Sequence, residues 1–198
     1  MEPNQVTLSI VPGFKNIPYT PAVRTEGSVC HGFKPLKGRP AEEAEAIEEA
    51  QDVDCLRRAL VDINKADTSF FTVGCEKSWN SEEDGFWAKG YIEFAFNCSD
   101  LAADAGAYFV AFFHFNRLLE QKSYAAPVRF HWELQGACFL DANRAGGFTA
   151  AVWIETGIGP SAEAARQVWC GAVDILRTHL CDFKLEGTAP IYPAAAAQ

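Results

Sequence analysis

The sequence predicts an α+β fold, with a four-stranded, mainly antiparallel sheet that carries helices on one face. Apolar and polar residues alternate along 128–141, as they do in a strand with one buried face. Residues 41–65 are rich in Ala, Glu, Leu and Arg, with acidic residues early and basic residues late, as a helix favours. Strand and helix signals then follow as strand, strand, helix, twice over. The predicted element order is therefore α-ββ-α-ββ-α.

The first forty residues are predicted to form a Pro-rich arm, because six of the ten prolines lie there. Within the arm, Val6–Val11 alternates like a short strand. The rest of the arm contains large apolar residues, among them Phe14, Ile17, Tyr19 and Phe33. We therefore expect the arm to wrap over the body of the protein rather than to be disordered.

The domain itself is predicted to span 41–186, and 187–198 to form a flexible tail. The expected elements are a helix at 41–65, strands at 68–76 and 86–98, a helix from 99 to about 122, strands at 128–141 and 147–156, and a helix from 161 to about 181. Tyr91-Ile92-Glu93 and Trp153-Ile154-Glu155 occupy corresponding places before the last two helices, so a duplicated ββα unit is an open alternative. In element order alone, the chain is similar to small acidic secretion chaperones and roadblock-like dimer modules.

Composition narrows the class of partner. The 198 residues carry a net charge of −9, and no cluster of Lys and Arg offsets it, so the chain repels phosphate backbones and nucleic acid is not expected to bind. The most apolar window, 105–119, contains His114 and Arg117 and is too short to span a bilayer. The N-terminus lacks the basic and apolar regions of a signal peptide. We therefore predict a cytoplasmic protein that binds neither nucleic acid nor membrane.

The seven cysteines are predicted to be free thiols. Their number is odd, they are dispersed along the chain, and no CxxC pair occurs. Reduced and buried, they would act as small apolar residues, as in a reducing cytoplasm. Cys30 and His31 are neighbours, but adjacent side chains of an extended chain point apart, so we do not expect a nucleophile and its base there.

The polar face of the strand at 128–141 is the most informative feature for function. Arg129, His131 and Glu133 alternate with apolar residues, so they project from the face opposite the helices. If the sheet is contiguous, the neighbouring strands add six residues to the same face. The candidate binding residues are Trp87, Lys89, Tyr91, Glu93, Arg129, His131, Glu133, Trp153 and Glu155. Aromatic residues ringed by charges are common at ligand and partner sites, whereas the alternatives are a solvated face with cross-strand ion pairs or a face covered by the N-terminal arm.

Two classes of function stay open. The first is a non-catalytic binding protein that uses this face for a protein partner or a small-molecule ligand, with a homodimer as one arrangement. The second is a hydrolase-like enzyme for a small molecule, with or without a metal, in which His131, Glu133 and Glu155 act as acid, base or ligands. The loop 157–161 lacks both the lysine of a P-loop and the third glycine of a dinucleotide fingerprint, so no cofactor is expected. We prefer the first class, because no catalytic motif is recognisable.

Overall fold

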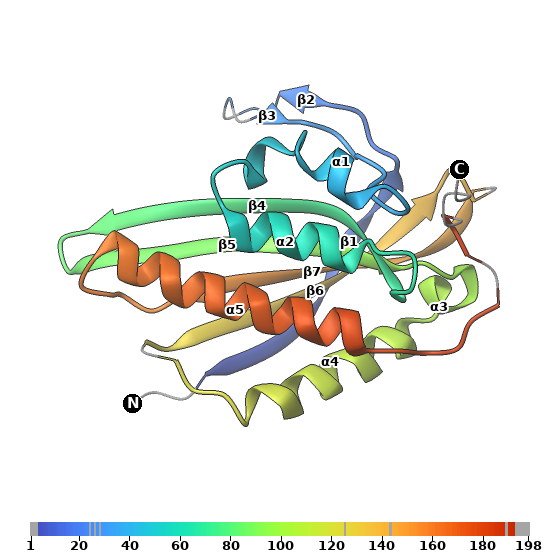
Figure 1. Ribbon diagram of the computed structural model, residues 1–198. Coiled ribbons are helices and arrows are strands. Elements are labelled where there is room, and N and C mark those ends of the chain that lie inside the picture. The colour runs from blue at the N-terminus through green and yellow to red at the C-terminus, as the bar shows by residue number, and fades with distance from the viewer. Residues whose placement is uncertain are drawn as a thin grey trace.

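The computed structural model is an α+β fold built on a five-stranded mixed sheet with the strand order β1-β6-β7-β5-β4 (Figure 1). It describes residues 4–23, 25, 27, 29–124, 126–142, 144–188 and 190–192. The strands of the sheet are β1 (Gln5–Ile17), β4 (Phe70–Glu82), β5 (Gly85–Phe96), β6 (Val128–Phe139) and β7 (Ala145–Thr156). β1 pairs with β6 in parallel, and all other pairs are antiparallel. A separate small hairpin consists of β2 (Ala22–Val23) and β3 (Val29–Cys30).

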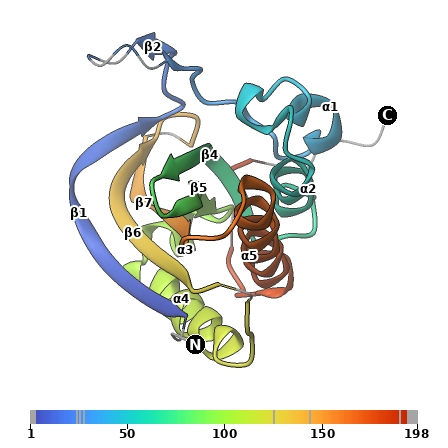
Figure 2. The ribbon, with the colours of Figure 1, turned by 90° about the vertical axis from the view of Figure 1, so that its left-hand side faces the viewer.

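The main helices lie on one face of this sheet. The helical elements are α1 (Pro40–Ala44), the 3-10 helix η1 (Glu48–Ala50), α2 (Asp54–Ile63), α3 (Ser99–Ala103), α4 (Ala105–Leu119) and α5 (Ala162–Asp182). Figure 1 shows α5 between α2 and α4 in front of the strands, and Figure 2 shows the same order from the side, with β1 at the sheet edge far from α2. None of the described helices is long and apolar enough to cross a membrane.

The predicted four-stranded, mainly antiparallel sheet with the order α-ββ-α-ββ-α is wrong, because the N-terminal segment supplies a fifth strand that makes the sheet mixed. β1 continues to Ile17, well past the predicted end at Val11, and pairs with β6 in parallel. Its register shifts between Val11 and Phe14, and Gly13 has a φ of 108°, which favours glycine. The strand was predicted too short, because this bulge interrupts the alternation of polar and apolar residues from which its length was predicted.

Both long helices expected before β6 are broken. The acidic run that follows Pro40 has no continuous apolar face, and there α1 and η1 replace the first half of the helix predicted at 41–65. In the second case, Asp104 ends α3 and begins α4, since its side chain accepts a hydrogen bond from the Gly106 N–H. The final helix, α5, lies within one residue of its predicted bounds at each end.

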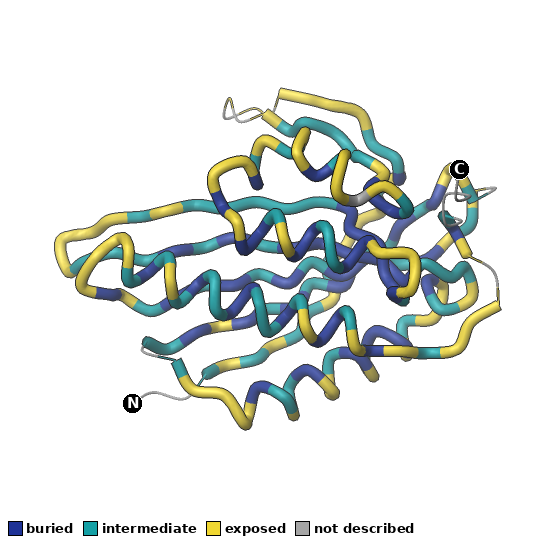
Figure 3. Tube along the Cα trace, viewed as in Figure 1, coloured by how far each residue is buried: buried dark blue, intermediate teal, exposed yellow. Residues whose placement is uncertain are grey.

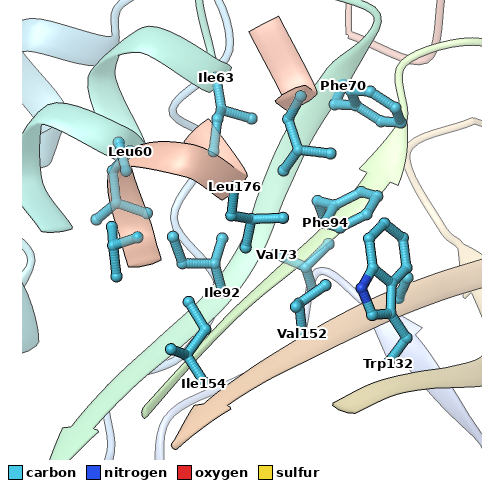
Figure 4. Packing of buried hydrophobic residues seen from close by; sticks show 14 of the residues in the cluster. Leu60, Ile63, Phe70, Val73, Ile92, Phe94, Trp132, Val152, Ile154 and Leu176 are labelled. Atoms are coloured by element: carbon cyan, nitrogen blue, oxygen red, sulfur yellow. The ribbon is translucent and has the colours of Figure 1, made fainter. Parts of the chain in front are cut away.

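The hydrophobic core fills the space between the sheet and the helices. Figure 4 shows Phe94, Val152 and Trp132 of neighbouring strands packed together, with the ring centroids of Phe94 and Trp132 5.6 Å apart. The burial map places the core under the helices and leaves the tip of the β4–β5 hairpin exposed (Figure 3). In β6, alternate residues from Val128 to Leu134 are buried, which confirms the predicted phase of that stretch.

A smaller cluster covers the opposite face of the sheet at one end, where Ala137 and Phe139 reverse the predicted phase of β6. Phe71 and Phe139 are each 1% exposed, with ring centroids 6.0 Å apart. Phe33 and Tyr192 pack on Phe71, from the segment after β1 and from the end of the chain. Tyr192 belongs to the predicted flexible tail, of which residues 189 and 193–198 lie outside the described residues. The cluster thus closes this end of the face.

The prediction of seven free thiols is also wrong. Cys55 of α2 and Cys170 of α5 form a disulfide, with their Cα atoms 5.5 Å apart, and the other five cysteines are free. The two residues lie 115 positions apart in sequence and meet because α2 packs on α5. Their spacing in the sequence therefore gives no sign of the bond.

Candidate functional site

The strand register places all nine predicted binding residues on one continuous face, away from the main helices. Glu155 of β7 lies between Lys89 of β5 and Arg129 of β6. In the same way, Trp153 lies between Tyr91 and His131. The face therefore consists of cross-strand rows, because directly paired residues project to the same side of a sheet.

The N-terminal strand widens this face instead of covering it. In the parallel pairing of β1 with β6, Thr7 lies opposite His131 and Ser9 opposite Glu133. The arm that follows β1 covers the sheet at the closed end, beyond Glu93. The stretch that carries the predicted residues is accordingly open.

Three adjoining hollows run along the open face, with volumes of about 350, 350 and 200 Å³. The first lies beside Trp87 and the loop after β7. It shares Arg129 and Glu155 with the second, which in turn shares Glu133 and Trp153 with the third. We call the three together the sheet groove.

Trp153 stands at the centre of the sheet groove and is held from three sides. Its ring centroid is 4.6 Å from that of Tyr91, and the Lys89 ammonium lies 5.3 Å from its centroid. The indole N–H donates a hydrogen bond of 2.8 Å to Oε2 of Glu133. An aromatic side chain fixed in this way offers a ligand a large apolar surface at a small entropic cost.

One end of the groove carries two cations that share one carboxylate. Lys89 Nζ lies 3.7 Å from Glu155 Oε2, and Arg129 Nη1 lies 3.6 Å from Glu155 Oε1. Neither cation makes a hydrogen bond to any residue that the structure describes. The side chains are also well exposed, at 42% for Lys89 and 63% for Arg129, so these pairs contribute little to stability.

The other end of the groove contains an ion pair with a buried carboxylate, which sequence reasoning missed. Glu93 is 4% exposed, and its Oε1 accepts hydrogen bonds of 2.6 Å from both Lys15 and Thr149. Lys15 follows the bulge in β1, whose two extra residues keep Lys15 on the same face as Val11, toward the groove. The sequence signal would have been the same alternation, continued past the bulge from Val11 to Lys15.

Tyr19 lies beside this ion pair. Its hydroxyl donates a hydrogen bond of 2.9 Å to the Val73 carbonyl. Burial and then the charge of Glu93 raise the pKa of Tyr19 well above its usual value. A Cβ on Gly74 would lie 3.0 Å from the Tyr19 hydroxyl and 3.6 Å from Glu93 Oε2, so glycine leaves room for the two side chains to approach.

His131 connects β6 to β1 through hydroxyl groups. Thr7 Oγ1 lies 2.7 Å from Nδ1, and Ser9 Oγ lies 3.0 Å from Nε2. The carboxylate of Glu133 is 3.7 Å from the same Nε2 atom. Sequence reasoning missed the two hydroxyls, because they belong to a strand that was not expected to join the sheet. Among the described residues, no group of three or more His, Cys, Asp and Glu side chains is arranged to hold a metal ion.

Two further sequence features take structural roles. Backbone hydrogen bonds hold the loop after β7 in place. The Gly157 N–H donates to the Pro127 carbonyl and the Gly159 N–H to the Phe86 carbonyl, each at 2.7 Å. His31 lies 3.4 Å from a carboxylate oxygen of Glu48, which gives its imidazole an acidic neighbour.

No protein-family model, curated protein or solved structure matches this chain. The geometry of the sheet groove is accordingly the basis for the functional proposal.

Proposed function

We propose that this chain is a non-catalytic binding protein, and that the sheet groove holds a small-molecule ligand or an extended segment of a protein partner. The observation that carries the proposal is the position of Trp153. It lies between two hollows of the groove, fixed by Tyr91, Lys89 and Glu133. Clustered, fixed aromatic side chains supply most of the energy at typical interaction sites.

The charges of the groove support a role in recognition. Lys15 pairs with Glu93, and Lys89 and Arg129 flank Glu155, so charges of opposite sign already compensate one another. Such a set orients a ligand and rejects wrong ones more than it adds affinity. We therefore expect the aromatic residues to set the strength of binding and the charges to set its selectivity.

The five tryptophans provide a direct test, because each indole N–H gives its own signal in a proton–nitrogen correlation spectrum. A library of aromatic fragments is titrated into the labelled protein. Bound fragments should shift the Trp153 indole signal, and Trp153→Ala should weaken their binding by more than about 1 kcal/mol, or roughly fivefold. Trp79→Ala is the matched control, since Trp79 is 40% exposed and lies outside the lining of the groove. Fragments that bind equally well to both variants would contradict the proposal.

A hydrolase is the second candidate, and the contact of Ser9 Oγ with His131 Nε2 is the observation that favours it. A hydroxyl at 3.0 Å from an imidazole nitrogen has the geometry of a nucleophile and its base. In a Ser-His-acid triad the carboxylate holds the other ring nitrogen, whereas Glu133 lies on the same nitrogen as Ser9. The test is labelling with a fluorophosphonate and hydrolysis of p-nitrophenyl acetate; activity that Ser9→Ala leaves unchanged would exclude this candidate.

The identity of the partner and the compartment rest on composition. The net charge of −9 still argues against nucleic acid, and a homodimer formed through the groove is one form of the protein partner. Analytical ultracentrifugation of the wild type and of Trp153→Ala distinguishes a homodimer from a ligand site. The cytoplasmic location stays a prediction. The argument from free cysteines no longer supports it, because the protein contains a disulfide and disulfides are rare in that compartment.

A further inference from the structure

The sheet groove continues into a larger hollow at the β4 edge of the sheet. This hollow has a volume of about 520 Å³, and Glu76 and Tyr91 line both it and the third hollow of the groove. Its other walls come from residues between 19 and 36, from the region of η1, from α2 and from β4. Figure 1 shows the β2–β3 hairpin and α1 on this side of β4. We call the hollow the edge pocket.

One cross-strand row leads from the centre of the groove to the edge pocket. Trp153 of β7 pairs with Tyr91 of β5, and Tyr91 pairs with Glu76 of β4. Neighbouring strands lie about 4.8 Å apart, so the row from Trp153 to Glu76 spans about 10 Å. An extended chain advances about 1.2 Å per bond, so a ligand whose ring lies on Trp153 reaches the edge pocket with a chain of about eight bonds.

The most buried residues in the lining of the edge pocket are aliphatic. Leu36, Leu60 and Val73 are 3%, 2% and 3% exposed, and the partly buried Ile47 adds to the same apolar surface. An aliphatic group that enters this space therefore leaves water for an apolar environment, which is favourable. The volume also lies within the range of roughly 300–1,000 Å³ that is usual for small-molecule sites.

The polar side chains of the edge pocket favour an uncharged occupant. Lys34 is cationic and Glu49 anionic, so the lining has no single sign of charge. Apart from two free thiols, the polar side chains in the lining already interact with other residues; they are Tyr19, His31, Lys34, Glu49, Thr72, Glu76 and Tyr91. An ionised ligand group would lose its hydration here and would have to compete with these existing interactions.

We infer that the sheet groove and the edge pocket form one site, whose ligand is an aromatic compound with an uncharged aliphatic chain. The ring lies on Trp153, and the chain crosses Tyr91 toward Leu36, Leu60 and Val73. This inference rests on the function proposed above, because it needs a ligand on Trp153, and it adds the chemical class of that ligand.

A series of N-alkylbenzamides tests the chain. N-Octylbenzamide should bind the wild type at least about tenfold more tightly than N-butylbenzamide, because the added methylene groups become buried. Analogues of N-octylbenzamide that end in a carboxylate or in an ammonium group should both bind at least about tenfold more weakly than the parent, whichever the sign of the charge. Equal affinities across the alkyl series, or tighter binding of either charged analogue, would overturn the inference.

The β2–β3 hairpin supplies a matched pair of variants that locates the chain. Val29 lines the edge pocket and is 53% exposed, so Val29→Trp can fill the space without cutting into the core. Val23 pairs directly with Val29, is 73% exposed and lies outside the lining. Val29→Trp should weaken N-octylbenzamide at least about tenfold, as expected for steric exclusion, and leave N-ethylbenzamide unchanged. Val23→Trp should change neither, and equal effects of the two variants would overturn the inference.

A measurement on the wild type makes the location independent of the folding of any variant. The terminal methyl group of bound N-octylbenzamide should give nuclear Overhauser contacts to the methyl groups of Leu36 and Val73, which line the edge pocket. Contacts to residues of the sheet groove alone would show that the chain lies along the strands, and would overturn the inference.

Trp153→Ala separates a failure of this inference from a failure of the proposed function. The variant should weaken N-ethylbenzamide and N-octylbenzamide by the same factor, at least about fivefold, because both lose the contact of the ring. If Trp153→Ala weakens both ligands but the wild type gains nothing from the longer chain, the proposed function stands and the inference fails. If Trp153→Ala changes neither ligand, the function proposed for the groove fails, and the single site fails with it.

Discussion

Acidification should destabilise this protein through one buried histidine of α5. His179 is 7% exposed and lies in an aromatic cluster, with ring centroids 5.3 Å from Phe115 and 5.5 Å from Phe183. Its Nε2 atom has no hydrogen-bond partner among the described residues. Burial lowers the pKa of His179 to about 4, with a small contribution from His114, while Asp182 and a hydrogen bond with the backbone of Ala111 act in the opposite direction.

The size of the effect follows from the two states of His179. In the unfolded chain its pKa is about 6.5, so the folded and unfolded values differ by about 2.5, and this corresponds to roughly 3 kcal/mol. Because the folded state binds the proton less readily, the stabilising contribution is complete above pH 6.5. It falls as the pH drops below about 6.5 and is lost at about pH 4.

Urea denaturation of the wild type and of His179→Phe at several pH values between 7.5 and 4.5 measures this contribution. Phenylalanine keeps a ring in the cluster and removes the titration, so the variant should lose roughly 2 kcal/mol less than the wild type over this range. His114→Gln is the control, because it removes an exposed histidine that makes only a small contribution to the pKa of His179, so it should keep most of the pH dependence of the wild type. If His179→Phe and the wild type lose stability in parallel, the reasoning about His179 is refuted.

Three further changes have defined outcomes. Lys37 is buried and donates hydrogen bonds to three backbone carbonyls and one hydroxyl. Lys37→Met should therefore lower the free energy of unfolding, measured in urea, by more than about 2 kcal/mol. A smaller loss would show that these acceptors find other donors. Thiol titration of the unfolded, unreduced chain should give five groups rather than seven. Reduction of Cys55–Cys170, which closes a loop of 115 residues, should cost about 5 kcal/mol in the loop-entropy model, and an unchanged melting temperature after reduction would contradict it. Trp153→Ala should cost about 1–2 kcal/mol of stability from its lost contact with Tyr91, and a loss of several kcal/mol in thermal denaturation would mean that the residue is part of the core.

The alternation of polar and apolar residues predicted the face of the candidate site, because this alternation can be seen within each strand separately. Arg129, His131 and Glu133 alternate with buried residues of β6, and Trp153 alternates in the same way in β7. These strands are also close in sequence, so their pairing follows from the turn between them. Phase within a strand and pairing across a short turn are both local properties, and the sequence therefore contained them.

The contributions of distant segments could not be read in the same way. Ser9 meets His131 across 122 positions of sequence, through a parallel pairing that no turn specifies. Lys15 reaches Glu93 because β1 continues beyond its bulge along β6, and Cys55 meets Cys170 because two helices pack together. In each case the contact depends on the tertiary fold, and it cannot be predicted from local sequence propensity.

The aromatic cluster of Phe71 and Phe139 has a consequence for the size of whatever occupies the sheet groove. The cluster covers the sheet beyond Glu93, so the groove ends there along the strands, and its other end lies beside Trp87. An occupant seated next to Glu93 along the strands has a fixed starting point, so additional length in the strand direction must extend past Trp87 into solvent. Homologous ligands of increasing length should therefore gain affinity stepwise until they pass Trp87, and beyond that point each added group should bring almost no further gain.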